Sequence, residues 1–185
     1  FGYRAGSSDD LSQNNNTAVG YFALTNATSG YDNVAVGANV LSSLTTGARN
    51  VGIGESALRN NNGNDNIAIG DRALDSATAG FRDIAIGSNA LTTHSGGGNS
   101  VAIGFNALEA STTGGSNVSI GNNSSELMAI TLRNTVVGND ALSKNTSGDD
   151  NVAIGSSAGV GSTTPFNQTG TESVYIGSLT EGGLQ

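Results

Sequence analysis

A short motif that returns about every 17 residues is the strongest constraint on how this chain folds. Residues 50–58 read NVGIGESAL and residues 66–74 read NIAIGDRAL, with close copies at 16–24, 33–41 and 151–158. We call the glycine that closes the Asn-x-Ala-Ile-Gly part the register glycine. The register glycines are Gly2, Gly20, Gly37, Gly54, Gly70, Gly87, Gly104, Gly121, Gly138, Gly155 and Gly177. A period this short predicts stacked coils and not separate domains.

Within each repeat, two β-branched residues flank one small residue, as in Ile67-Ala68-Ile69 and Val101-Ala102-Ile103. A period of two is typical of a strand with one aliphatic face and one very small face. An Ala-Leu pair follows and returns a side chain to the same interior. A second glycine stands seven residues before most register glycines and predicts a turn with positive φ. The sequence therefore predicts an all-β parallel solenoid of about ten coils.

We expect residues 1–185 to form one solenoid domain, with two departures from the repeat. In residues 122–134 the Ala-Leu pair is replaced by Ser124-Ser125, and Thr131 stands at the turn-glycine position, so we expect a reshaped, more hydrophobic coil there. In residues 159–170 the spacing lengthens around Pro165-Phe166, which predicts a protruding loop. Residues 1–5 resemble the end of a broken repeat, so we expect the sequence to be part of a longer fibre chain.

Stacking turns each repeat position into a column of residues. We expect an asparagine column whose side chains hydrogen-bond from coil to coil. Its members are Asn16, Asn33, Asn50, Asn66, Asp83, Ser100, Asn117, Asn134, Asn151 and Ser173. The preceding column alternates in charge through Asp32, Arg49, Asp65 and Arg82, and again at Arg133 and Asp150. Because such pairs are exposed, we expect them to fix the register of the coils more than to stabilise them.

Composition excludes several classes of partner. The net charge is −8, and seven basic residues spread over 185 make no patch that could bind a phosphate backbone or an anionic membrane surface. No apolar run approaches the length of a membrane span. The absence of cysteine excludes disulfides and thiolate metal sites. We expect no cofactor, no nucleic acid partner and no membrane insertion.

A single coil buries too little apolar surface to offset clearly the backbone entropy lost on ordering it. We therefore expect a homo-oligomer. The small face that contains Ala35, Ala68, Ala85 and Ala102 would let the backbone of another chain approach closely, so we expect copies to pack on this face.

The repeat Asn-[Val/Ile/Thr]-Ala-[Val/Ile]-Gly-x-x-Ala-Leu, with Thr-Thr-Gly between copies, resembles repeats of long phage tail fibres and tailspikes. It is also similar to the head repeats of trimeric autotransporter adhesins such as YadA. The resemblance extends from Gly2 to Gly177 and implies a left-handed β-roll, a homotrimer, and an extracellular location on a virion or a bacterial surface. Adhesin heads usually have shorter coils, which favours the phage branch.

The remaining candidate site residues are aromatic. Exposed rings on a rod could stack on sugars or cover gaps between coils and chains. The candidates for ligand contact are Tyr21, Tyr31, Phe81, Phe105 and Phe166. His94, the only histidine, has no sequence partner for a triad or a zinc site, and we expect it in an exposed turn.

These features predict a structural or adhesive segment of a fibre that spaces or presents a region binding a host receptor, without catalysis. One alternative is that the segment itself binds a cell-surface glycan as a lectin-like adhesin. Another is a tailspike depolymerase, which would need clustered acids, whereas the acids here lie in separate columns.

Overall fold

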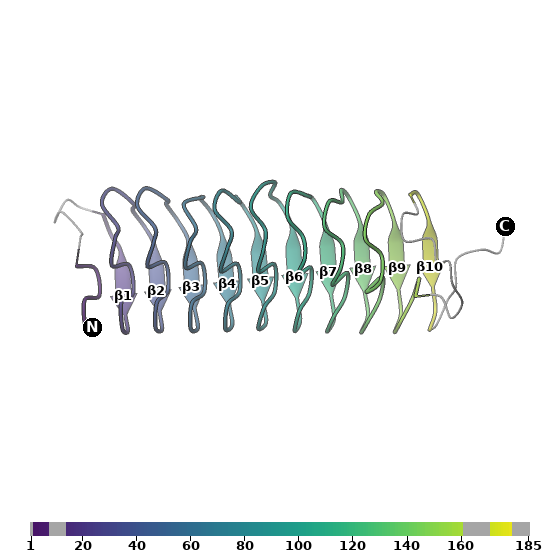
Figure 1. Ribbon diagram of the computed structural model, residues 1–185, viewed down its shortest axis with the longest axis horizontal. Helices are drawn as coiled ribbons and strands as arrows, with labels where there is room; N and C mark the ends of the chain where they lie inside the picture. The colour runs from purple at the N-terminus through teal and green to yellow at the C-terminus, as the bar shows by residue number, and fades with distance from the viewer. Residues whose placement is uncertain (1, 8–13, 161–170, 179–185) are drawn as a thin grey trace.

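A computed structural model describes residues 2–7, 14–160 and 171–178 of the chain. Ten three-residue strands lie side by side in one parallel sheet, in chain order, and form a rod (Figure 1). The strands are β1 (Thr17–Val19), β2 (Val34–Val36), β3 (Val51–Ile53), β4 (Ile67–Ile69), β5 (Ile84–Ile86), β6 (Val101–Ile103), β7 (Val118–Ile120), β8 (Thr135–Val137), β9 (Val152–Ile154) and β10 (Val174–Ile176). Each repeat position pairs with the same position of the next coil, as Ala68 does with Ala85. The all-β parallel solenoid predicted from the repeat is confirmed.

The core of the rod is filled by the central residue of each strand, which is small in all but β8 and β10, and by the Ala-Leu pairs. Ala68, Ala73 and Leu74 are fully buried in one repeat, and Ala85, Ala90 and Leu91 repeat the arrangement in the next. The prediction that the alanine face of the strands receives another chain is therefore wrong. That face lies inside the coil, where alanine occupies most of the inward strand positions.

The β-branched residues of the strands point outward instead. We call their surface the outward face. Its members are Thr17, Val19, Val34, Val36, Val51, Ile53, Ile67, Ile69, Ile84, Ile86, Val101, Ile103, Val118, Ile120, Thr135, Val137, Val152, Ile154, Val174 and Ile176. These side chains are half-buried by their neighbours along the stack but remain open to solvent; Ile53, Ile69 and Ile154 are 38%, 37% and 43% exposed.

The two kinds of glycine have different roles from those predicted. The register glycines have positive φ; Gly70 has φ 138°, and a Cβ there would lie 2.5 Å from the carbonyl oxygen of Gly87. Most turn glycines do not. Gly47 has no positive φ, but a Cβ on it would lie 2.6 Å from the carbonyl oxygen of Gly63. The prediction of positive φ at the turn glycine is wrong there, because close approach of the next coil excludes a side chain.

Each coil also places non-glycine residues in the left-handed region. In one coil these are Arg72 (φ 54°), Leu74 (φ 53°) and Arg82 (φ 56°). The left-handed region costs an L-residue roughly 1–2 kcal/mol. The same repeat positions adopt this conformation in successive coils, because the chain can turn the corner of the coil only with a left-handed residue there. The register of the stack, and not local preference, decides the backbone at these corners.

The irregular coil over residues 122–134 keeps the register of its neighbours. β7 and β8 pair in line, and the carbonyl oxygen of Thr131 accepts a hydrogen bond from Asn117 at the turn-glycine position. Ser125 replaces the core leucine, and Met128 is fully buried nearby in the core. The additional apolar side chains Leu127 and Ile130 lie outside, 45% and 65% exposed. Most of the loop expected at 159–170, with Phe166, lies outside the described residues.

Candidate functional site

The asparagine column forms a continuous hydrogen-bonded ladder. The backbone N–H of each member donates to the side-chain oxygen of the member before it, from Asn33 on Asn16 (2.9 Å) to Ser173 on Asn151 (3.0 Å). The amide group of most asparagines also donates to a turn carbonyl, as Asn134 does to Gly148 (3.0 Å). These hydrogen bonds satisfy the side-chain amide that each of these coils buries. The ladder is therefore structural, and its members from Asn33 to Asn151 are buried.

In one coil the ladder continues through an aspartate, Asp83, which faces the chain's histidine. Asp83 and His94 are both fully buried, and Asp83 Oδ2 lies 3.6 Å from His94 Nε2. This distance is too long for a hydrogen bond, and neither atom has another partner among the described residues. Asp83 Oδ1 accepts the Ser100 N–H at 2.9 Å, and His94 Nδ1 lies 3.4 Å from Ser111 Oγ. The expectation that His94 is an exposed turn residue is wrong.

The protonation of this pair follows from its burial. Burial raises the pKa of Asp83 to about 6, although the Ser100 N–H opposes the shift. Burial also lowers the pKa of His94 below its usual 6.5. Both shifts oppose charge in the core, so the imidazole is neutral at neutral pH, while the Asp83 carboxyl is protonated only below about pH 6 and is ionised at a cost above it. The pair is enclosed, so it has no access to a substrate and cannot serve as a catalytic centre.

Column arithmetic alone could have placed His94 in the core. His94 follows Leu44, Asn61 and Ala77 at intervals of 16–17 residues, and the same column continues to Met128. All five of these side chains are buried. The spacing could therefore have predicted that His94 is buried. The residue types in this column are mixed, however, so hydrophobic pattern alone does not mark the column as part of the core.

The charged column forms a single file along one edge of the strands. The backbone N–H of each member donates to a carbonyl oxygen of the preceding coil. The acceptor is the residue just before that coil's own column member, as Tyr31 is for Arg49 and Asn64 is for Arg82. Arg49 forms a bidentate pair with Asp65 (2.5 and 3.0 Å). Arg133 pairs in the same way with Asp150. Each pair lowers the pKa of its carboxyl through hydrogen bonds from the guanidinium.

The aromatic candidates fall into separate places. Tyr21 stacks on Tyr3 with 5.7 Å between ring centroids and meets Phe22 edge-on at 4.4 Å. Tyr31 lies under the guanidinium of Arg49 and accepts a hydrogen bond from it. Phe81 lies in the same column as Tyr31, three coils further on. Phe105 is 49% exposed, in the column of Tyr21.

A shallow hollow of about 560 Å³ opens beside Phe81. Its lining comes from three successive coils and consists of Arg49, Asn62, Gly63, Asn64, Asp65, Thr78, Ala79, Phe81 and Arg82. The ring of Phe81 is 40% exposed, and the Arg82 guanidinium lies 5.3 Å from its centroid. In this lining the sequence predicted Phe81 as a ligand contact and placed Arg49, Asp65 and Arg82 in the charged column, but only the fold brings Asn62 and Asn64 beside them.

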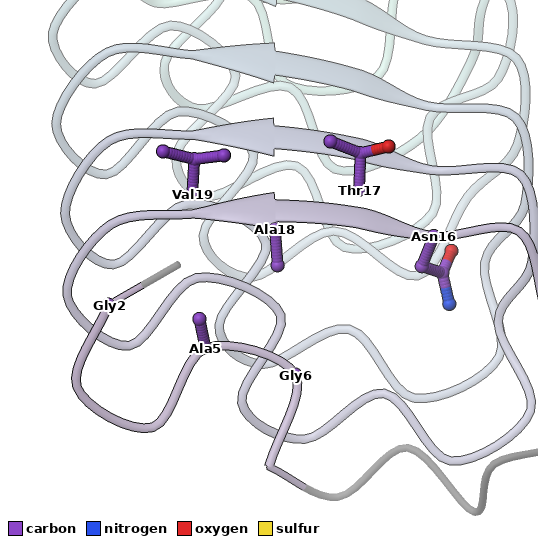
Figure 2. A pocket seen from close by; sticks show the side chains of 7 residues that line it. All are labelled: Gly2, Ala5, Gly6, Asn16, Thr17, Ala18 and Val19. Carbon is purple, nitrogen blue, oxygen red and sulfur yellow. The ribbon is translucent and has the colours of Figure 1, made fainter.

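A second hollow of about 510 Å³ lies at the N-terminal end of the rod. Figure 2 shows Ala18 pointing into it from β1 towards Ala5 and Gly6, on the opposite side of the strand from Thr17 and Val19. Its lining has no ionisable side chain and consists of Gly2, Ala5, Gly6, Asn16, Thr17, Ala18 and Val19. This lining has no group that could perform acid, base or nucleophilic chemistry.

The part of the chain that the structure describes contains no cluster of three His, Cys, Asp or Glu residues that could hold a metal ion. Within that same part, no helix is long and apolar enough to cross a bilayer. The chain matches no family model, and neither a curated protein nor a solved structure is similar to it.

Proposed function

We propose that this chain is a structural segment of an extracellular fibre, a homotrimer that spaces or presents a region binding a host receptor, without catalysis of its own. The observation that carries the proposal is the outward face. Eighteen of its twenty side chains are valine or isoleucine, over all ten strands. Monomeric proteins rarely leave a large continuous apolar surface exposed, and such surfaces mark contacts with other molecules.

Copies of the same chain are the occupant that fits this surface best. The outward face is flat and repeats along the whole rod, so a second copy aligned with the first meets the same residue at every coil. The repeat spacing then sets the register between chains as well as within one. The number three, the left-handed winding and the assignment to a phage tail fibre or a bacterial surface rest on the resemblance of the repeats.

Molar mass in solution tests the proposal. A trimer has a mass of about 55 kDa, three times 18.3 kDa, by sedimentation or light scattering. Circular dichroism of the same sample reports whether the strands are formed. A folded species with the mass of one chain would contradict the proposal, and a folded dimer would keep the role of the face but refute the number three.

A further inference from the structure

The hollow beside Phe81 combines an exposed aromatic ring with an unusual concentration of hydrogen-bond donors. Its lining includes the ring of Phe81 together with the side chains of Arg49, Asn62 and Asn64. An aromatic face binds the C–H side of a sugar ring, and donors beside it bind the sugar oxygens. Elsewhere, Tyr3 and Tyr21 stack on each other, and Phe105 does not line this hollow.

Two asparagines in the hollow are held in one orientation. Asn62 Oδ1 accepts the Thr45 N–H at 2.7 Å, and Asn64 Oδ1 accepts the Ala48 N–H at 2.8 Å. Because each side-chain oxygen faces a backbone N–H, the assignment of oxygen and nitrogen in both amides is settled. Both residues are exposed, so the NH₂ groups are left to donate to a ligand.

The hollow is lined by two arginines, Arg49 and Arg82, and by one carboxylate, Asp65. Asp65 is engaged by Arg49 through two hydrogen bonds, whereas Arg82 makes no ion pair within the described residues. Its guanidinium lies 3.5 Å from Asn99 Oδ1 and over the ring of Phe81, and its charge also helps to lower the pKa of the Asp65 carboxyl, after the larger effect of Arg49. A guanidinium of this kind binds a carboxylate or sulfate with a fork of two N–H groups.

We propose that this hollow binds an acidic saccharide: a sugar unit stacks on Phe81, its hydroxyl or carbonyl oxygens accept from Asn62 and Asn64, and its acidic substituent pairs with Arg82. The chain as a whole has a net charge of −8. Recognition of an anion therefore depends on this local cation. This assignment goes beyond the structural role proposed above and does not require it, because all the residues of the hollow come from one chain.

Binding of acidic oligosaccharides to the intact chain tests the site. The probes are sialyllactose, oligogalacturonates and heparin-derived oligosaccharides, each beside a neutral counterpart such as lactose or maltotriose, titrated by calorimetry and by saturation-transfer NMR. We expect at least one acidic probe to bind about tenfold more tightly than its neutral counterpart, and added salt to weaken this difference because it screens exposed charges. If no acidic probe is preferred, the assignment is wrong.

Three variants locate the site on the rod. Phe81→Ala should weaken binding of the preferred probe at least tenfold, and Arg82→Gln should reduce its affinity to that of the neutral counterpart. Phe105→Ala is the matched control, because its ring has similar exposure outside the hollow. Equal losses for Phe81→Ala and Phe105→Ala would place binding elsewhere and overturn the proposal.

The molar mass of each variant separates this proposal from the structural one. If Phe81→Ala changes the mass of the assembly and wild-type protein binds no probe, Phe81 belongs to a contact between chains and the saccharide site is refuted. If the wild-type chain is a monomer that binds the acidic probe through Phe81, the trimer is refuted and the saccharide site stands.

Discussion

Ala85 and Ile86 are neighbours in β5, yet they belong to parts of the molecule with different requirements. Ala85 is fully buried and pairs with Ala68 and Ala102 in an inward column made mostly of small residues. Ile86 lies in an outward column that is open to solvent along the rod. The interior of each coil is closed by its own chain, whereas the outward face is open to solvent and is the contact surface that we propose for another copy. Changes inside should alter stability, and changes outside should alter assembly.

The largest expected effect is the loss of the assembly when the outward face carries a charge. Ile69→Glu places a carboxylate in the middle of the proposed contact, where no cation of the outward face can pair with it, and an unpaired buried charge is very costly. We expect the variant to sediment as a single chain while its circular dichroism still reports strands.

Ser76→Glu is the control for this experiment, because Ser76 is exposed away from the strands. It introduces the same charge and should leave the molar mass unchanged. An Ile69→Glu variant with the mass of the wild-type assembly would show that the outward face is not the contact.

The second prediction concerns two neighbouring core positions, where one side chain is smaller and the other larger than in the usual repeat. Gly52 takes the place of the usual strand alanine, and a Cβ there would lie 2.5 Å from Val40 Cγ1. Val40 in turn takes the place of the usual alanine of the Ala-Leu pair and is fully buried. Gly52→Ala should therefore destabilise by overpacking and Val40→Ala by leaving a cavity, each by about 1–3 kcal/mol.

The double variant Gly52→Ala/Val40→Ala recreates the arrangement of the neighbouring coils. We expect it to be more stable than the sum of the single variants predicts, with a coupling of about 1 kcal/mol or more in chemical denaturation. Simple additivity would mean that the two side chains do not compete for the same space.

The third prediction is a pH dependence that originates at Asp83. Its pKa rises from 3.8 to about 6 on folding, so the folded state holds the proton more tightly than the unfolded chain. The free energy of unfolding contributed by this group therefore falls as pH increases from about 4 to about 6, and stays low above that range. Asp83→Asn removes this penalty and should stabilise the protein by about 1–3 kcal/mol at pH 7.5, with the gain disappearing near pH 4.

Asn134→Asp is the reciprocal control, because it places a carboxylate in a regular coil where Asn134 donates to Gly148. This variant should lose stability at pH 7.5 and recover part of it in acid. The lowered pKa of His94 makes the protein less stable as pH falls below 6.5. This effect is present in the wild-type protein and in each variant, so it largely cancels when a variant is compared with the wild type. A pH-independent effect of Asp83→Asn would show that the carboxyl is ionised at no cost.

The smallest effect is expected at the exposed ion pairs. Asp65→Asn removes the bidentate partner of Arg49, whose side chain is 46% exposed. Solvent and salt screen such a pair, so the loss in the midpoint of thermal unfolding should be smaller than for any core variant above and should vanish at high salt. Asp32→Asn, which has no ion pair with Arg49 among the described residues, is the control. A large loss with Asp65→Asn would give the charged column a role in stability that exposure does not predict.

The repeat by itself determined the architecture. Its period requires coils stacked in register, and the position of each residue in the period gives the columns, including the file that joins Asp32, Arg49, Asp65 and Arg82. This works because a parallel stack places equivalent repeat positions next to each other, so residues one period apart in the sequence are neighbours in the structure. The positions of the asparagines predicted their hydrogen bonds for the same reason.

Only the tertiary structure decided which face of each strand is inside. Both faces are apolar, so a period of two does not tell alanine from isoleucine; the narrow cross-section of the coil decides, since it accepts Ala68 and Leu74 and leaves no room for Ile67 or Ile69. The same holds for the contact of Asp83 with His94, and for the hollow beside Phe81. Both bring together residues from different positions of the repeat. Which of these positions meet depends on the path of the backbone around each coil, and the repeat spacing does not give that path.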